Sequence, residues 1–185
     1  MQLKDYIPNI PTKYKKIFFS GISFDSSKVK KNYIFFAIKG NKFDGNNYID
    51  IAVKNGATII ISEKKKIKKI KNTIFLQHPN IRKLLAEVSY KIAGKIPKKI
   101  VAVTGTNGKS SVTDFYYQIL NLNLKKVASI GTIGIRTKAK NKDIPNTTLD
   151  PIQLSKILKD LKKKKIQYVI MEASSHGLKQ NRLDG

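Results

Sequence analysis

The chain has 185 residues, enough for one medium domain or two small ones with a real hydrophobic core. It contains no cysteine, which excludes a disulfide framework and thiolate chemistry. Residues 1–8 lack the apolar core of a signal peptide, and the longest apolar runs have only the length of a strand. We therefore expect a cytoplasmic protein with no membrane insertion.

The formal net charge of +25 on its face favours a nucleic acid or an anionic membrane as partner. Lysine supplies 34 of the 37 basic residues, because Arg82, Arg136 and Arg182 are the only arginines. A surface that reads nucleic acid tends to use the planar fork of arginine and to interleave aromatic side chains, and this sequence has neither pattern. We interpret the charge as a solvated surface that follows composition and expect no nucleic-acid partner. A basic nucleic-acid-binding protein is kept as a distant alternative, which retention on DNA would reveal.

Residues 1–95 are predicted to form a small N-terminal α/β domain. Runs rich in β-branched and aromatic residues at 33–38 and 58–61 are typical of buried strands, and 74–76 predicts a third. Residues 46–56 predict a helix that ends at Gly56. Asn80 is expected to cap a further helix, whose apolar side chains recur on one face at Ile81, Leu84, Leu85, Val88 and Ile92.

Residues 96–185 are predicted to be the start of a parallel-sheet P-loop ATPase domain. Strands are expected at 100–103, 127–130 and 168–171, with a helix after residue 111 and another that begins at Pro151. A polar stretch runs from 131 to 150. The alternation predicts parallel βαβ units, in which ligands bind at the C-terminal ends of the strands.

The first of these strands is followed by the octapeptide TGTNGKSS, residues 104–111. A strand, a glycine-bearing turn, Lys-Ser and a helix, in that order, are typical of a phosphate-binding loop, although the glycines are closer together than in the general pattern. Loop amides and the helix N-terminus would bind phosphates, Lys109 would neutralise them, and the Ser110 hydroxyl would bind Mg²⁺. The alternative is an ordinary turn with a surface lysine. The predicted cofactors are ATP and Mg²⁺, bound by Gly105, Thr106, Asn107, Gly108, Lys109, Ser110 and Ser111.

Glu172 directly follows the last predicted strand, as an acidic Mg²⁺ ligand does in phosphate-loop enzymes. Gly105, Gly131 and Glu172 each follow a predicted parallel strand, so we expect them to converge on one crevice. Lys109 and Glu172 are the predicted catalytic residues, with Ser110 and Glu172 as metal ligands. A surface salt bridge is the alternative role for Glu172, and His78 is interpreted as structural.

Four stretches together resemble the Mur ligases, and among them the MurE-type branch. TGTNGKS is similar to their ATP-binding signature, and residues 25–29, 33–40 and 44–45 resemble their N-terminal domain. NTTLDP at 146–151 resembles their substrate loop. The most specific likeness is MEASSHGLKQNRLDG at 171–185.

The resemblance implies an ATP-dependent amide ligase of peptidoglycan precursor synthesis, active in cell-wall biogenesis. It would add the third amino acid, diaminopimelate or lysine, to UDP-N-acetylmuramoyl-L-alanyl-D-glutamate through an acyl phosphate. Positions that hold the UDP moiety in the family correspond here to Phe24, Ser26, Asn41, Lys42 and Phe43. Those that bind the muramoyl-dipeptide correspond to Asn146, Thr147, Thr148, Ser174, Gln180 and Arg182. The expected partners are these substrates alone, with the protein a monomer.

Ser27, Leu149 and the Asn41-Lys42 pair depart from the family pattern. The sequence ends at Gly185, inside the expected ATP-binding domain, so we expect a fragment without the family's C-terminal domain that is inactive alone. The alternative is a nucleotide- or UDP-sugar-binding fragment of another Mur-ligase-like enzyme.

Overall fold

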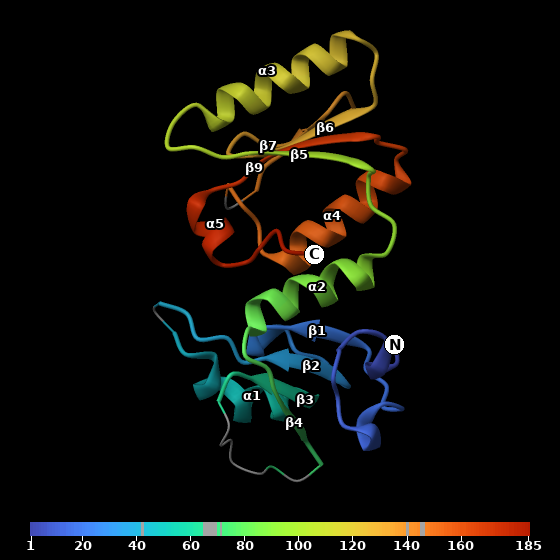
Figure 1. The fold of residues 1–185 in the computed structure, drawn as a ribbon, viewed down its shortest axis with the longest axis vertical. Coiled ribbons are helices and arrows are strands. Elements are labelled where there is room, and N and C mark those ends of the chain that lie inside the picture. The colour runs from blue at the N-terminus through green and yellow to red at the C-terminus, as the bar shows by residue number, and fades with distance from the viewer. Residues whose placement is uncertain (42, 65–69, 71, 140, 145–146) are drawn as a thin grey trace. The chain divides into compact units, whose positions relative to one another are not determined.

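The computed structural model describes residues 1–41, 43–64, 70, 72–139, 141–144 and 147–185. The chain divides into two compact units, Met1–Val88 and Ser89–Gly185 (Figure 1). Both units combine a sheet with helices, so the predicted α/β class is confirmed. The division between the units falls within helix α2 (Ile81–Ala93). The predicted boundary between the two functional domains, between residues 95 and 96, stays a prediction.

The first unit is built around a four-stranded parallel sheet with the order β1-β2-β3-β4. Its strands are β1 (Gly21–Ser23), β2 (Tyr33–Phe36), β3 (Ala57–Ser62) and β4 (Ile74–Gln77). The connections contain η1 (Leu3–Asp5), η2 (Thr12–Tyr14), η3 (Ser26–Lys28), η4 (Gly45–Tyr48) and α1 (Ile49–Lys54).

Strands β2 and β3 form the centre of this unit's core. Ile34, Phe35 and Phe36 are all buried, so both faces of β2 are covered, as is usual for a parallel strand. On one face Phe35 and Ile60 pack with Ala52 of α1. The predicted helix at 46–56 is in fact the 3₁₀ helix η4 followed by the short α1, and the predicted strand at 33–38 ends at Phe36.

The second unit contains a five-stranded mixed sheet with the order β5-β9-β6-β7-β8. Strands β5 (Lys99–Val103), β9 (Tyr168–Glu172) and β6 (Val127–Gly131) are parallel, as predicted. Strands β7 (Gly134–Thr137) and β8 (Asn141–Lys142) continue the sheet antiparallel. This antiparallel extension was not predicted, because it lies in the polar stretch after residue 131, where only short apolar signals occur.

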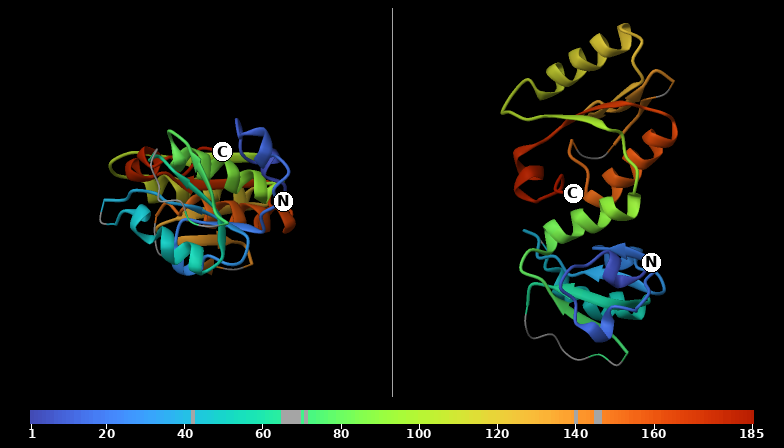
Figure 2. Two further views of the ribbon diagram at one scale, coloured as in Figure 1. Left: turned by 90° about the horizontal axis from the view of Figure 1, so that it is seen from below. Right: turned by 45° about the vertical axis from the view of Figure 1, so that its right-hand side comes forward.

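Helices cover both faces of this second sheet (Figure 2). Helix α3 (Lys109–Leu122) places Tyr117 against Val127 and Ile170 on one face. Helix α4 (Pro151–Lys163) packs its leucines against Ala128, Val169 and other sheet residues on the opposite face. The short helix α5 (Ser175–Lys179) follows β9. No helix in the described part of the chain is long and apolar enough to cross a membrane.

Helix caps account for several of these boundaries. The Asn80 side chain accepts the backbone N–H of Lys83 at 2.9 Å, so the predicted cap of α2 is confirmed. Asp150 accepts the N–H of Gln153 at 2.9 Å, and Pro151 occupies the first turn of α4. His78 Nδ1 lies 2.9 Å from the carbonyl oxygen of Asn80 and 3.2 Å from its backbone nitrogen, which agrees with a structural role at this helix start.

Candidate active site

The predicted phosphate loop connects β5 to α3 in the second unit. Gly108 stands at the N-cap of α3 with φ of +79°, a left-handed conformation that residues with a Cβ rarely adopt. The Nζ of Lys109 donates to the carbonyl oxygen of Gly105 at 2.7 Å and to that of Thr106 at 3.2 Å. The lysine thus lies across its own loop, where its charge is available to an anion bound there. The exposed segment 105–108 offers its backbone to solvent next to a 14-residue helix.

Glu172, at the end of β9, is 3% exposed. Its Oε1 accepts the backbone N–H of Thr132 at 2.8 Å, and its Oε2 accepts the Thr132 hydroxyl at 3.0 Å. A Cβ at Gly131 would lie 2.2 Å from Oε1, so only glycine allows this approach. Of the three residues expected to converge, Gly131 and Glu172 lie side by side, whereas Gly105 does not contact them in the described structure. Thr132 as the partner of Glu172 was not predicted.

A small pocket lies between Glu172 and helix α3, which follows the phosphate loop. It is lined by Ser110, Thr113, Asp114, Ser129, Gly131, Ile133, Gly134, Arg136 and Glu172. Arg136 forms an ion pair with Asp114 and lies 4.9 Å from the centre of the Tyr117 ring. This pair ties β7 to α3 and closes one wall of the pocket. This pair was not predicted, because the two residues are 22 positions apart in the chain.

The pocket suits a hard cation. Ser110 and Glu172 both line it, and a hydroxyl and a carboxylate are oxygen ligands of the type that Mg²⁺ prefers. Among the described residues, no group of three or more His, Cys, Asp or Glu side chains could hold a metal ion. Mg²⁺ at nucleotide sites uses one or two protein ligands, with phosphate oxygens and water in the remaining positions. Two protein oxygens at this place therefore fit Mg²⁺ bound together with a nucleotide.

The predicted dipeptide-binding residues form one hydrogen-bond network near the end of β9. The Thr148 hydroxyl accepts the N–H of Ser174 at 2.9 Å and donates to its Oγ at 3.1 Å. Arg182 donates to the Thr148 carbonyl at 2.5 Å and to Gln180 Oε1 at 2.8 and 3.1 Å. Thr147 Oγ1 lies 3.0 Å from Thr132 Oγ1, which connects the network to Glu172.

The predicted UDP-binding residues lie in two loops of the first unit. Phe24 and Ser26 follow β1, and Asn41 and Phe43 follow β2. Since β1 and β2 are adjacent and parallel, both loops leave the same edge of the sheet. Lys42 of this set, and Asn146 of the dipeptide set, lie outside the described residues. The roles assigned to all residues of both sets stay predictions.

Gly131→Ala is expected to weaken MgATP binding several-fold while the unit stays folded. The new methyl group would displace the Glu172 carboxylate from Thr132, because Oε1 stands 2.2 Å from the position of the Cβ. Calorimetric titration with ATP, in the presence and in the absence of Mg²⁺, measures the effect. Lys156→Ala is the control, since it changes an exposed side chain of α4 away from this site. Equal MgATP affinities for both variants would contradict a role for Glu172 at the nucleotide site.

Comparison with known families agrees with this geometry. Residues 19–91 match the model of the Mur ligase family catalytic domain, and residues 103–185 match that of the Mur ligase middle domain. The UDP-N-acetylmuramoyl-L-alanyl-D-glutamate–2,6-diaminopimelate ligase of Rickettsia typhi is 41% identical over 179 residues, which are 95% of this chain and 36% of that protein. The ligase of the same name from Fusobacterium nucleatum is 41% identical over 184 residues, or 98% of this chain and 36% of that protein.

A solved structure of a UDP-N-acetylmuramoyl-L-alanyl-D-glutamate–2,6-diaminopimelate ligase superimposes with a TM-score of 0.84 at 31% identity. The superposition covers 100% of the present chain and 38% of the chain in that structure. The present chain thus spans little more than a third of the length of these relatives.

The chain belongs to the Mur ligase family, an assignment that its two sheets, its phosphate loop and both family models share. Within that family it corresponds to the N-terminal and middle domains of MurE-type ligases. The middle domain is the ATP-binding domain of the family.

Proposed function

We propose that this chain is the UDP-substrate-binding and ATP-binding part of a ligase that adds diaminopimelate to UDP-N-acetylmuramoyl-L-alanyl-D-glutamate. The observation that carries the proposal is the common pocket of Ser110 and Glu172 next to the phosphate loop, in a chain about 40% identical to ligases of that name. The 179 aligned residues are 95% of this chain, so the similarity includes both the unit assigned to the UDP moiety and the unit assigned to ATP.

The reaction proceeds in two steps. A carboxylate oxygen of the substrate's D-glutamyl residue attacks the γ-phosphorus of ATP, the bond to the β-phosphate oxygen breaks, and ADP leaves. An amine of diaminopimelate then attacks the acyl carbon, loses a proton, and expels inorganic phosphate to leave an amide. The protein's task is to hold anionic groups together and to stabilise the charge that moves between them.

The described residues supply specific parts of this task. Lys109 exchanges its loop carbonyls for β- and γ-phosphate oxygens, and the amides of residues 105–111 surround the same phosphates. Thr132 keeps the Glu172 carboxylate oriented toward the pocket. When bound to Ser110 and Glu172, Mg²⁺ would neutralise phosphate charge during transfer. Residues of the Thr148–Arg182 network orient the dipeptide.

The proposal includes a cytoplasmic location, which follows from nucleotide substrates, and a monomeric state. A chimera tests the proposal directly, in which this chain replaces the matching third of the Rickettsia typhi ligase. We expect it to release ADP only when both UDP-N-acetylmuramoyl-L-alanyl-D-glutamate and diaminopimelate are present. Should the chimera fail to fold, the chain itself must be stabilised by MgATP and by the UDP substrate separately. Stabilisation by neither ligand, or retention on DNA at physiological salt, would contradict the proposal.

A further inference from the structure

In the first unit, residues 38–41 and 43–45 after β2 form the two arms of a hairpin with a closed base. Lys39 and Asp44 face each other as an antiparallel bridge. On one side of this bridge the N–H of Gly40 donates to the carbonyl of Phe43 at 2.8 Å. On the other side the N–H of Gly45 donates to the carbonyl of Ile38 at 2.9 Å. The Phe43 side chain, opposite Gly40, is 68% exposed. A large apolar ring held out on a closed hairpin is suited to contact a ligand.

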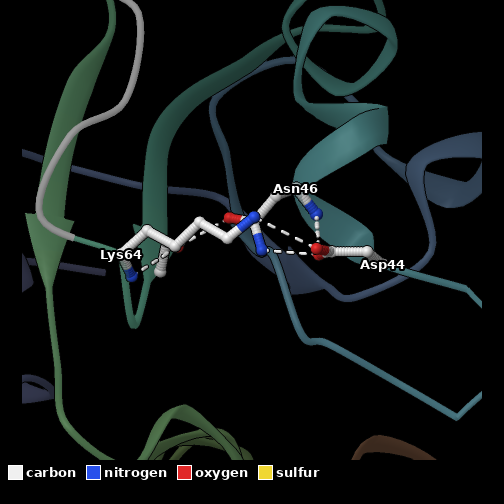
Figure 3. A network of polar contacts seen from close by, with 4 residues as sticks. Asp44, Asn46 and Lys64 are labelled. Atoms are coloured by element: carbon white, nitrogen blue, oxygen red, sulfur yellow. Dashed lines mark hydrogen bonds and ion pairs between the residues drawn. The ribbon is translucent and has the colours of Figure 1, made fainter.

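A row of polar side chains connects the base of this hairpin to strand β3. Asp44 Oδ1 accepts the backbone N–H of Asn46 at 2.9 Å and its side-chain amide at 2.6 Å, and Oδ2 accepts Lys64 Nζ at 3.1 Å (Figure 3). Asn46 Oδ1 in turn accepts the Ser62 hydroxyl at 2.7 Å. Ser62 is fully buried at the end of β3, and its Oγ also accepts the N–H of Lys64 at 3.1 Å. The hairpin base is thus fastened to the core of the sheet.

The charge of Asp44 is maintained by these same contacts. Hydrogen bonds from the side chain and the backbone of Asn46, followed by the contact with Lys64, lower the pKa of Asp44 to about 2. Because the pKa is lowered by folding, the stabilisation is present above the ordinary value of 3.8 and is lost as the pH falls toward 2. The ion pair with Lys64 is partly exposed and adds little, so the Asn46 contacts matter most.

We propose that Asp44, Asn46 and Ser62 form a brace that fixes the backbone at Asn41 and Phe43 for binding of the UDP part of the substrate. Asp44 is then a positioning residue: it acts through Asn41 and Phe43 and does not itself touch the ligand. This inference rests on the proposed function of the hairpin in UDP binding. Its physical basis is that a loop ordered before binding loses less conformational entropy when the ligand binds.

The test compares Asp44→Ala and Asp44→Asn with Asp50→Ala, which removes an exposed carboxylate of α1 in the same unit. Amide hydrogen exchange at Gly40 and Gly45 reports on the hairpin, and calorimetry gives the Kd for UDP-N-acetylmuramoyl-L-alanyl-D-glutamate. Asp44→Ala is expected to speed exchange at these two amides and to raise the Kd about fivefold, with MgATP affinity unchanged. Asp44→Asn keeps one acceptor oxygen for Asn46, so it should restore most of both properties.

Each other result has a definite meaning. Faster exchange throughout β2 and β3 in Asp44→Ala would refute positioning and assign Asp44 to the stability of the whole unit. Unchanged exchange, or a Kd equal to that of Asp50→Ala, would also overturn the brace. A wild-type chain that does not bind the UDP substrate would contradict the proposed function of this unit, and it would refute the ligand role of the brace even if exchange at Gly40 and Gly45 responds as expected.

Discussion

Lys109→Ala is expected to abolish the stabilisation of the second unit by MgATP. The Nζ lies across the loop, 2.7 Å from the Gly105 carbonyl, and alanine leaves the phosphates without this positive charge. At an MgATP concentration about a hundredfold above the Kd, binding stabilises the folded unit by about 2.7 kcal/mol. For a unit of this size, that raises the Tm by many degrees. Thermal unfolding with and without MgATP measures the loss, and ADP release by the chimeric ligase should disappear with it.

Lys156→Ala is the matched control, because it removes an exposed lysine from α4 on the opposite face of the sheet. Both variants should have the circular dichroism and the ligand-free Tm of the wild type, since Lys109 contacts only the backbone of its own loop in the described structure. An MgATP-dependent shift in Lys109→Ala equal to that of the control would contradict the phosphate-loop assignment.

Strands buried on both faces were the easiest elements to predict. A parallel strand such as β2 or β9 needs apolar residues at nearly every position, so it forms a continuous run that stands out in the sequence. The phosphate loop was predictable for a related reason, because strand, glycine turn and helix follow one another along the chain. Caps at Asn80 and Asp150 likewise depend on neighbours within three residues.

Features that depend on distant partners could not be predicted in this way. The Thr132 contact to Glu172 joins residues 40 positions apart, and the Arg136–Asp114 pair joins a strand to a helix. Strand β7 has only four residues, of which Ile135 is the single large apolar one, so its pairing with β6 is visible only in the folded sheet. Residues 44–45 stood out only through their family resemblance, and the contact of Asn46 with Ser62 in the brace comes from the fold.

Arg182→Ala is expected to raise the Kd for UDP-N-acetylmuramoyl-L-alanyl-D-glutamate about ten- to a hundredfold and to leave that for MgATP nearly unchanged. Within the described residues, Arg182 uses three of its five N–H groups on the Thr148 carbonyl and Gln180 Oε1, so two remain for a substrate carboxylate. A charge-assisted contact of this kind is worth about 1.5–3 kcal/mol. The substitution removes that contact and also releases the Thr147–Thr148 loop.

Two further variants separate these effects. Lys179→Ala removes an exposed positive charge from α5, three residues before Arg182, and should bind both ligands like the wild type. Arg182→Lys keeps the charge but not the fork, so it should recover only a small part of the lost affinity. Calorimetric titration of each variant with each ligand gives the comparison. If Arg182→Ala weakens MgATP and the UDP substrate equally, Arg182 supports the fold or the phosphate site, and its assignment to the dipeptide is wrong.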